Sequence, residues 1–249
     1  MSVSETYNMD CMEYMRGLPD KAFDLAIVDP PYGIKQGGDK NNTRSCLVKQ
    51  SNGSKILVTS KSYHSFDDDK SPDISYFNEI LRVSKNQIIW GANHFISKIP
   101  YDSPCWIVWD KVNGKNDFAD CELAWTSFDS AVRKFTFMWH GMCQGSPTDG
   151  AVQQGDKSKN EKRIHPCQKP VALYKWIIAN YAHAGDRILD THLGSGSSRI
   201  AAYDMGFDFV GIEIDKEYFE AEEKRYKEHI SQLELIPTEE IHELMFEEK

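Results

Sequence analysis

Two runs of consecutive apolar residues, each followed by acidic residues, dominate the hydrophobic pattern of the chain. Residues 23–29, FDLAIVD, are apolar on both faces up to Asp29, and residues 208–215, DFVGIEID, repeat this pattern up to Glu213. Such runs are typical of central parallel strands that are covered by helices on both faces. Because ligands bind at the carboxyl ends of strands in open α/β sheets, we expect Asp29 and Glu213 at a ligand-binding edge.

Shorter strands and helices alternate along the rest of the chain. Apolar runs bounded by Gly, Pro, Asn and Asp predict further strands at 6–10, 86–91, 104–109, 121–127, 134–139 and 187–190. Helical spacing and start signals predict helices at 71–84, 169–182, 199–206 and 216–234. The apolar face of the first helix is expected to carry Ile74, Phe77, Ile80 and Leu81. Residues 187–215 form one βαβ unit, so the pattern as a whole predicts an α/β fold.

Two long polar segments, residues 33–73 and 140–165, interrupt this pattern and are expected to be loops. Long loops in a compact domain are usually functional or disordered. Residues 33–65 hold six basic residues against one acidic residue, and residues 151–169 hold five against two. The whole chain has a net charge of −9, and residues 211–249 carry thirteen acidic against five basic residues. Each basic segment alone is typical of a solvated loop, but two of them beside one candidate site favour contact with a polyanion.

Length and composition restrict the class of protein. At 249 residues the chain fits one large α/β domain with insertions. No apolar run is long enough to span a membrane and the N-terminus has no apolar signal region, so we expect a soluble cytoplasmic protein. The six cysteines are scattered without a CxxC pair or zinc-finger spacing, so we expect reduced thiols and no metal site.

The tetrapeptide Asp29-Pro30-Pro31-Tyr32 directly follows the first buried strand. Two prolines restrict the backbone and lack N–H donors, so their carbonyl oxygens remain as fixed acceptors. A carboxylate, a rigid carbonyl and an aromatic face therefore converge on one small volume. These four residues are the candidate catalytic groups.

A second candidate site lies in the segment RILDTHLGSGSS, residues 187–198. Gly194 and Gly196 allow a tight turn and a close approach of the backbone to a ligand, and the serines after them begin a helix whose N–H groups favour an anion. Glu213 ends the next strand, where a carboxylate can accept both hydroxyls of a ribose. The segment lacks a full GxGxxG pattern and a GK[ST] phosphate loop, so a nucleoside cofactor is favoured over a dinucleotide or a triphosphate.

With these motifs the chain resembles the amino-group DNA methyltransferases that use S-adenosyl-L-methionine. Asp29-Pro30-Pro31-Tyr32 looks like their catalytic DPPY motif, HPCQKP at 165–170 looks like their H-P-x-Q-K-P motif, and LDTHLGSGSS looks like their cofactor loop. The catalytic motif precedes the cofactor loop, which is similar to the order in the permuted β-class. One departure is Thr191-His192, which stands where the family usually has Pro-Phe, so His192 either packs against the cofactor or hydrogen-bonds to it.

The resemblance implies a Rossmann-like class I methyltransferase fold over residues 1–249, a single catalytic domain. Its mostly parallel seven-stranded sheet would have helices on both faces, a circular permutation and inserted recognition loops. Residues 187–190 and 208–215 would be its first and second strands, 6–10 the third and 23–29 the fourth. Residues 86–91, 104–109 and 121–127 would complete the sheet.

The resemblance also implies which residues contact the cofactor. Asp10 would bind the adenine amino group of S-adenosyl-L-methionine, unless it is only an exposed cap, and Lys169 would approach the methionine carboxylate, unless it is only solvated. The full predicted set is Asp10, Cys11, Asp29, His165, Gln168, Lys169, Asp190, His192, Gly194, Ser195, Gly196, Ser197 and Glu213.

The implied reaction is methyl transfer to the exocyclic N6 of an adenine flipped out of double-stranded DNA, because an Asp at the first motif position is associated mostly with adenine in the family. Residues 34–70 would contact DNA and residues 140–164 would recognise the target, with no membrane contact. A homodimer is plausible by the same resemblance. The alternatives are N4 of cytosine, an RNA adenine, or a non-catalytic nucleic-acid-binding module on the same scaffold. Residues 235–249 predict a short acidic helix without an assigned role.

Overall fold

The computed structural model describes most of the chain, with gaps in the two polar segments and at both ends. The described residues are 2–35, 45–49, 55–59, 63–65, 68–113, 119–139, 143–147, 153–154 and 160–234. For residues 45–49, 55–59 and 153–154 the structure describes the backbone and not the side chains. Residues 235–249 and most of 34–70 and 140–164 therefore lie outside the described residues.

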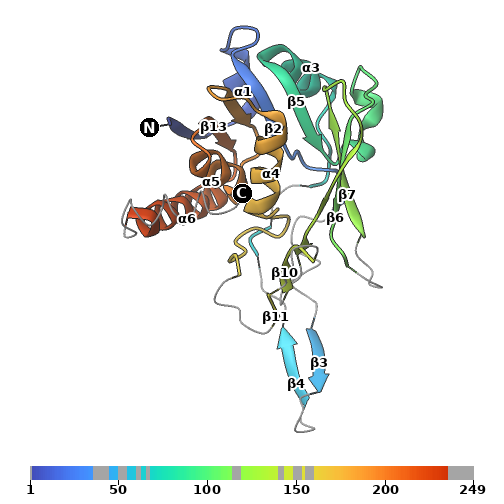
Figure 1. The fold of residues 1–249 in the computed structure, drawn as a ribbon, viewed down its shortest axis with the longest axis vertical. Helices are drawn as coiled ribbons and strands as arrows, with labels where there is room; N and C mark the ends of the chain where they lie inside the picture. Colours follow the sequence, from blue (N-terminus) through green and yellow to red (C-terminus); the bar gives the residue numbers. More distant parts are fainter. Residues whose placement is uncertain are drawn as a thin grey trace.

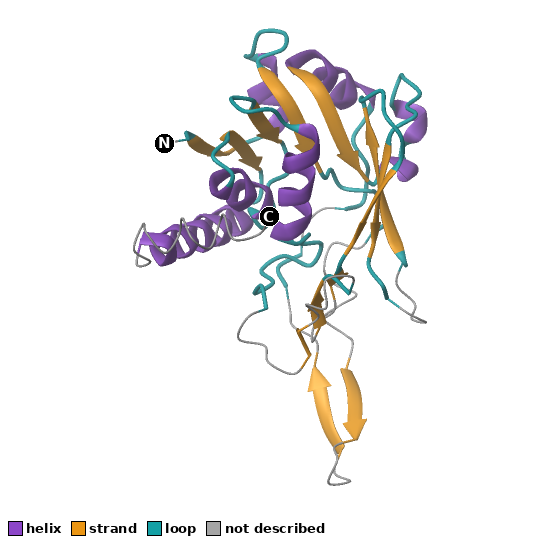
Figure 2. Ribbon diagram, viewed as in Figure 1, coloured by secondary structure: helices purple, strands orange, loops and turns teal. Residues whose placement is uncertain are grey.

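A large central sheet organises the described chain (Figures 1 and 2). Its eight strands run in the order β1-β13-β12-β2-β5-β7-β6-β8. Neighbours are parallel from β1 to β5, whereas β7 is antiparallel to β5 and to β6. The strands are β1 (Ser4–Asn8), β2 (Phe23–Val28), β5 (Ser84–Trp90), β6 (Trp106–Asp110), β7 (Cys121–Thr126), β8 (Arg133–Thr136), β12 (Arg187–Asp190) and β13 (Asp208–Glu213).

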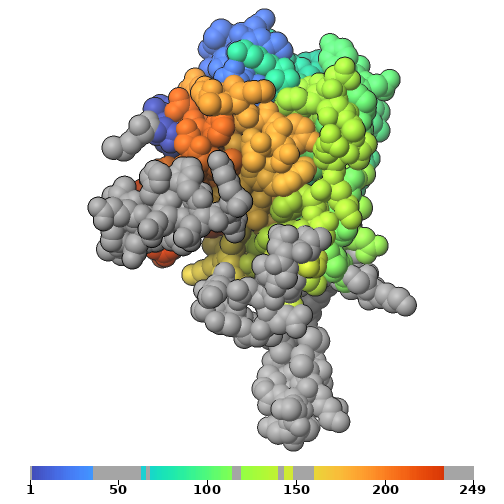
Figure 3. All heavy atoms as spheres, in the orientation of Figure 1, coloured from blue at the N-terminus to red at the C-terminus, as the bar shows by residue number. Residues whose placement is uncertain are grey.

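The strand order confirms the predicted fold class and the circular permutation. Strands β12 and β13 come from the end of the chain, yet they lie between β1 and β2 from its beginning. The space-filling view shows the same neighbourhood, with N-terminal residues in blue against C-terminal residues in orange (Figure 3). The expected number of seven strands is too low, because β8 pairs in parallel with β6 and extends the sheet by one strand.

Helices cover both faces of the sheet because consecutive apolar residues of each central strand point in opposite directions. Leu25 and Ile27 pack with α4 (Val171–Tyr181) and α5 (Ser197–Asp204). Ala26 and Val28 pack on the other face with α1 (Cys11–Arg16) and α3 (Ile74–Val83). The helix α6 (Lys216–Glu234) follows β13. Two short 3₁₀ turns, η1 (Ala92–His94) and η2 (Ile96–Lys98), follow β5.

One detail of the predicted helix faces is wrong. The face of α3 that meets the core carries Tyr76, Phe77, Ile80 and Val83, whereas Ile74 is 54% exposed. Ile74 is the first residue of the helix, directly after the capping residue Asp73, which accepts from the N–H of Ser75. Phe77 and Ile80 are buried and Leu81 packs against the core as expected, so the predicted face is wrong at Ile74 alone.

The two polar segments, predicted to be loops, contain regular structure in their described parts. Strands β3 (Ser45–Lys49) and β4 (Lys55–Thr59) form an antiparallel pair. Strands β9 (Met138–Trp139), β10 (Cys143–Gly145) and β11 (Gln153–Gln154) form a second small sheet. In Figure 1, β3 and β4 lie far from the central sheet, beyond β10 and β11. The expectation of irregular loops is thus wrong for these stretches, because short apolar runs rich in β-branched residues, such as KILVT, pair in a hairpin.

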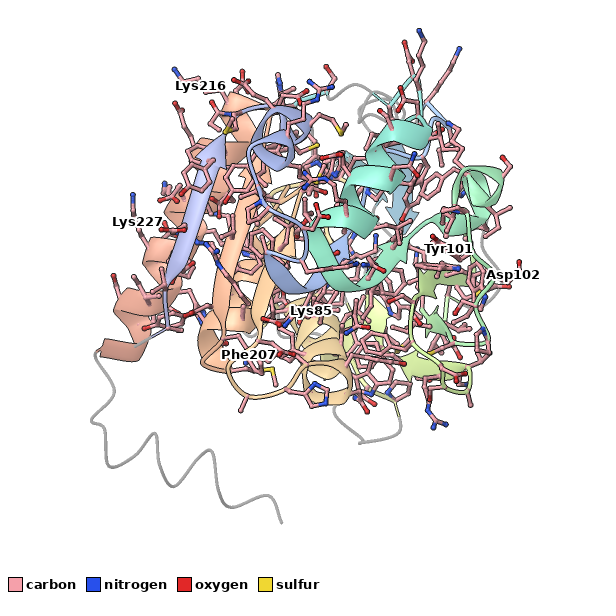
Figure 4. The ribbon with its side chains drawn as sticks, turned by 90° about the horizontal axis from the view of Figure 1, so that it is seen from above. Lys85, Tyr101, Asp102, Phe207, Lys216 and Lys227 are labelled. Atoms are coloured by element: carbon pink, nitrogen blue, oxygen red, sulfur yellow. The ribbon has the colours of Figure 1, made fainter. Side chains whose placement is uncertain are left out.

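The fold places the carboxyl ends of five parallel strands at one edge of the sheet. Asn8, Glu213, Asp190, Val28 and Trp90 end β1, β13, β12, β2 and β5 in that spatial order. Across the width of the molecule, α6 with Lys216 and Lys227 lies at one side, and Tyr101 and Asp102 lie at the other (Figure 4). No helix among the described ranges is both long enough and apolar enough to cross a membrane.

Candidate active site

The backbone that follows β2 holds Tyr32 in a defined place. Its ring stacks on His94 with centroids 5.0 Å apart and an interplanar angle of 19°, and its other neighbour, Phe95, is edge-on at 6.4 Å. Gly91 makes this packing feasible: a Cβ there would lie 2.1 Å from Cε1 of Tyr32. The turn after Tyr32 is stabilised by a hydrogen bond from the N–H of Gly33 to Asp68 Oδ1 at 2.9 Å. The structure therefore brings an aromatic ring beside Asp29, as the sequence predicts.

Both carboxylate oxygens of Asp29 have partners within the protein. The hydroxyl of Tyr32 donates to Oδ1 at 2.7 Å, and the ammonium of Lys169 pairs with Oδ2. Lys169 also donates to the hydroxyl of Tyr32 at 3.2 Å. Burial, followed by the neighbouring charge of Asp29, raises the pKa of Tyr32 well above its ordinary value, so this phenol stays protonated and is a donor.

Lys169 lies at the centre of a charged cluster that includes a residue the sequence did not suggest. Its side chain is 3% exposed and contacts Glu122 Oε2 at 3.2 Å as well as Asp29. Glu122 also pairs with Lys111. Burial lowers the pKa of Lys169, but Asp29 and Glu122 outweigh it and raise the pKa above its usual value, so Lys169 remains charged. For Glu122, burial opposes ionisation, but Lys169 and Lys111 lower its pKa to about 2.

The position of Lys169 bears on its predicted role. The described contacts of its ammonium are to Asp29, Glu122 and Tyr32, which belong to the catalytic motif and to β7. Contact with the carboxylate of a cofactor stays a prediction. The one signal that could have pointed to Glu122 is the occurrence of an acid inside the apolar strand CELAWTS.

The cofactor loop after β12 is built on two buried carboxylates. Asp190 accepts from the N–H of His192 at 3.0 Å and from the hydroxyl of Ser198 at 2.6 Å. Glu213 accepts from the N–H of Gly194 at 2.8 Å and, with its other oxygen, from the N–H of Asp215 at 2.9 Å. Burial raises the pKa of Asp190 to about 7 and raises that of Glu213, in each case against the hydrogen bonds that favour the charged form.

The glycines of this loop adopt the backbone conformation that requires glycine. Gly194 and Gly196 have φ of +53° and +71°, and a Cβ on Gly196 would come within 2.7 Å of Glu222. Gly196 precedes α5, and the hydroxyls of Ser195 and Ser197 lie 3.1 Å apart at this helix start. The loop therefore presents backbone and hydroxyl groups at the N-terminus of a helix, as predicted for an anion contact.

Asp10 and Cys11 lie beside the same edge. Asp10 follows β1, which pairs with β13 so that Asn8 lies opposite Glu213. Asp10 is exposed and caps α1, with Oδ1 accepting from the N–H groups of Met12 and Glu13 at 2.7 and 3.0 Å. Burial and Asp10 together raise the pKa of Cys11 to about 12, so this thiol is neutral. The structure thus shows the capping role of Asp10, and its contact with an adenine stays a prediction.

His192 takes part in a polar contact that the sequence did not reveal. Its Nδ1 lies 3.0 Å from the hydroxyl of Thr191 and 3.4 Å from that of Tyr76, and the two hydroxyls are 2.7 Å apart. Burial lowers the pKa of His192 to about 4, so the ring is neutral at pH 7. Thr191 and His192, the departure from the usual motif, are thereby fixed to α3 through Tyr76.

His165 and Gln168 of the HPCQKP segment contact different parts of the protein. His165 packs edge-on against Tyr218 with centroids 4.3 Å apart, and its ring lies beside Gly194 of the cofactor loop. Burial and Lys169 lower the pKa of His165 to about 3. Gln168 instead accepts from the N–H of Ile164 at 2.8 Å and so closes its own loop. The structure therefore brings His165 to the cofactor loop, whereas the described contacts of Gln168 are structural.

Arg225 of α6 is a further residue that the sequence did not suggest. Its guanidinium donates to the carbonyl oxygen of Ser195 at 2.7 Å and to the hydroxyl of Ser197 at 2.9 Å. It also pairs with Glu161 at 3.0 Å, and Glu161 accepts from the N–H of Val171 at 3.0 Å. Arg225 thus ties the cofactor loop to the beginning of α4.

The surroundings of Glu213 fit the nucleoside part of S-adenosylmethionine. The carboxylate stands at the strand end, and Ile214, directly after it, is an apolar side chain that is 67% exposed. The α5 N-terminus has no side-chain cap within the described part of the chain. Three features therefore lie at one edge of the sheet. They are a carboxylate that can accept from hydroxyls, an apolar surface that can contact a base, and an uncapped helix start that can bind an anion.

The permuted sheet, the acid at the end of β2 and the glycine loop at the end of β12 define a class I methyltransferase with a site for an amino group. The family model described as DNA methylase matches residues 23–224, and the chain belongs to this family. The protein is thus a DNA methyltransferase, and its cofactor is S-adenosylmethionine.

Curated relatives agree with this family, and a solved structure has a similar fold. The chain is 24% identical to the type II methyltransferase M.HinfI of Haemophilus influenzae over 249 aligned residues, which cover 88% of this chain and 67% of that protein. It is 24% identical to the type II methyltransferase M2.DpnII of Streptococcus pneumoniae over 236 residues, 87% of each chain. The PvuII DNA methyltransferase (cytosine-N4-specific) has a similar fold, with a TM-score of 0.52, 12% identity and coverage of 89% of this chain and 86% of that one.

Proposed function

We propose that this DNA methyltransferase modifies the exocyclic N6 amine of an adenine that is flipped out of double-stranded DNA. The observation that carries the proposal is the position of the Asp29 carboxylate beside the Tyr32 ring at the end of β2. By family resemblance, an Asp at this position is associated mostly with adenine. A base inside a duplex cannot reach a strand end, so it must leave the stack, at a cost of a few kcal/mol.

The residues of the motif have complementary roles toward the amine. The lone pair of an exocyclic amine is delocalised into the ring, so the amine is a weak nucleophile. The Asp29 carboxylate and the Pro30 carbonyl accept its two N–H bonds, which favours a tetrahedral nitrogen and stabilises the positive charge that develops there. Pro30 and Pro31 fix the backbone, and Tyr32 provides the face on which the base stacks.

The cofactor residues hold the methyl donor in line with this amine. Bound S-adenosylmethionine supplies a methyl group that its sulfonium already activates. Glu213 would accept the ribose hydroxyls, Ile214 and His192 would pack against the base, and Asp10 with Cys11 would contact its amino group. Gly194, Ser195, Gly196 and Ser197 receive the carboxylate at the start of α5, and Asp190 and His165 support the loop. Alignment of the reacting atoms within about 3 to 3.5 Å provides much of the rate.

The basic segments are proposed to hold the DNA. Residues 33–65 hold six basic residues against one acidic residue, residues 151–169 hold five against two, and β3 and β4 extend away from the central sheet (Figure 1). Phosphate contacts position the complex, and side chains at base edges read the sequence. A homodimer also stays a prediction, and analytical ultracentrifugation with and without DNA tests it.

The test is methyl transfer from labelled S-adenosylmethionine to unmethylated genomic DNA, followed by nucleoside mass spectrometry of the digest. The wild type is compared with Asp29→Ala and with Asp20→Ala, a control acid whose side chain is 76% exposed. We expect N6-methyladenine from the wild type and from Asp20→Ala, and none from Asp29→Ala. N4-methylcytosine would overturn the assignment of the base. Label found in RNA but absent from DNA would overturn that of the substrate.

A further inference from the structure

The charges around Asp29 form a closed cluster of two carboxylates and two ammonium groups. Lys169 lies between Asp29 and Glu122, and Glu122 lies between Lys169 and Lys111. Asp29 follows β2, Glu122 belongs to β7 and Lys169 precedes α4. Three separate parts of the fold therefore meet at the proposed acceptor of the target amine, and the four formal charges sum to zero.

Lys169 has no alternative position in solvent. Its side chain is 3% exposed, and its ammonium lies 5.3 Å from the centroid of the Trp90 ring and 5.7 Å from that of Tyr32. A buried ammonium that loses its counter-ion is costly, because the protein interior solvates a charge poorly. Any movement of Lys169 away from Asp29 therefore needs a second anion nearby.

Glu122 is placed to be that anion. Trp90 of β5 pairs with Ala124 of β7, and Glu122 is two residues before Ala124, on the same face of the sheet. Its Oε2 is 3.2 Å from the ammonium of Lys169, and its other oxygen is held by Lys111. The side chain of Glu122 is 23% exposed, and each of its two oxygens pairs with one of these lysines.

The target amine and Lys169 compete for the same acceptor. Oδ1 of Asp29 accepts from Tyr32 and Oδ2 accepts from Lys169. Each carboxylate oxygen has two lone pairs, so an N–H bond from the base weakens the bond that the same oxygen already accepts, and Lys169 is the donor with a second carboxylate to move to. Tyr32 belongs to the stack with His94, whereas Lys169 is already shared between two carboxylates.

From this geometry we infer that Glu122 is a positioning residue for methyl transfer, which receives Lys169 when Asp29 takes up the target amine. The inference rests on the proposed function, because it assumes that Asp29 accepts an N–H bond of the base. Glu122 touches neither base nor cofactor in this scheme and acts through Lys169. Lys111 keeps Glu122 ionised and aimed at the cluster.

The test compares Glu122→Gln with Asp110→Asn on DNA that contains the mapped target. Asp110 is the matched control: it lies on β6 next to the cross-strand partner of Glu122, and its carboxylate pairs with Lys134 at 3.3 Å. We expect Glu122→Gln to lower kcat by about 10- to 100-fold, the range for a misplaced reacting group, with unchanged dissociation constants for cofactor and DNA. Glu122→Asp should recover part of kcat, and Asp110→Asn should keep the wild-type value.

A double-mutant cycle with Lys169→Met separates positioning from general structural damage. If Glu122 acts through Lys169, Glu122→Gln causes no further loss of kcat in the Lys169→Met background, or restores part of it. A loss that multiplies with that of Lys169→Met would overturn the inference, as would a Glu122→Gln variant as active as Asp110→Asn. If Glu122→Gln does not fold, Glu122→Gln with Lys111→Met restores the charge balance and should show the same low kcat.

The inference and the proposed function fail in different ways. A wild-type protein that leaves adenine unmodified contradicts the proposed function, whatever the variants do. A wild type that forms N6-methyladenine, together with a fully active Glu122→Gln variant, contradicts the role of Glu122 alone. The dissociation constants, measured by calorimetry and by fluorescence anisotropy, show in both cases whether the variant still binds its two ligands.

Discussion

Replacing Gly91 by alanine isolates the contribution of the Tyr32 position to catalysis. Gly91 has φ of +68°, and a Cβ there would lie 2.1, 2.4 and 2.5 Å from three atoms of the Tyr32 ring. To reach ordinary contact at 3.4 Å the nearest ring atom must withdraw by 1.3 Å. A shift of that size breaks the 2.7 Å hydrogen bond to Asp29 and the stack on His94. Because a misplacement of about 1 Å can cost about 10²-fold in rate, we expect kcat/KM to fall by about that factor.

Gly206→Ala is the matched control for Gly91→Ala. Gly206 has φ of +76°, and a Cβ there would meet nothing within 4 Å. Both substitutions impose the left-handed backbone on an alanine, which costs about 1–2 kcal/mol and lowers the melting temperature by about 2–8 °C in a domain of this size. Gly206→Ala should lose this stability and keep full activity.

Initial rates of methyl transfer to DNA, together with thermal melts, decide the outcome. The expected pattern is a loss of stability in both variants and a loss of activity in Gly91→Ala alone. Equal activities of the two variants would refute the reasoning, because the Tyr32 ring would then not need its place beside Asp29. An inactive Gly206→Ala would show that strain of the backbone, and not contact with Tyr32, governs the activity.

Three further predictions concern the cofactor loop and its support. Glu213→Gln should weaken cofactor binding by about 1–3 kcal/mol in calorimetry, because an amide cannot accept both backbone N–H bonds that the carboxylate accepts; unchanged affinity would contradict this. Arg225→Met should also raise the cofactor Kd, whereas Lys216→Met, whose side chain points to solvent (Figure 4), should not. Burial raises the pKa of Glu222 from 4.5 to about 7, so its stability contribution is present below pH 4.5 and is lost as the pH rises through 7. The melting temperature of Glu222→Gln relative to wild type should therefore rise between pH 4.5 and 7, and a constant difference would disprove the assignment.

The fold could be predicted largely because its signals are local. Runs such as LAIV in β2 are apolar on both faces, and this is possible only where helices cover both sides of a strand. The order of motifs then gave the permutation, which the pairing of β1 with β13 confirms. The eighth strand lies within residues 134–139, which are predicted as a strand but are not part of the seven-stranded sheet that the resemblance implies. These residues divide at Phe137, whose N–H donates to the Asp110 carbonyl, so one predicted strand becomes β8 and β9.

The charged partners in the site could not be predicted, because they depend on how distant elements meet. Lys169 and Asp29 are 140 residues apart, and Glu122 comes from a strand whose pairing was not yet known. A lysine beside a helix start is typical of a solvated side chain, and here it is 3% exposed. The same holds for Arg225 of α6, which contacts Ser195 of the cofactor loop, 30 residues away in the chain. Single motifs identify the acids and glycines of the site. The tertiary structure then decides which lysine or arginine side chains neutralise the acids.

The charged cluster around Asp29 is better suited to an exchange of ion-pair partners than to stabilising the fold. Moving an ion out of water costs several kcal/mol per group, and an ion pair often stabilises a fold no better than well-packed apolar residues of similar volume. A protein that needed only a stable end of β2 would gain little from four charges there. A reaction in which a neutral amine approaches, donates two N–H hydrogen bonds and becomes transiently cationic needs a negatively charged acceptor with a free lone pair. Lys169 pairs with Asp29 while no amine is bound, and Glu122 provides the place to which Lys169 can move. Removing the second carboxylate should therefore leave Asp29 blocked by Lys169, which is a loss of turnover without a loss of binding.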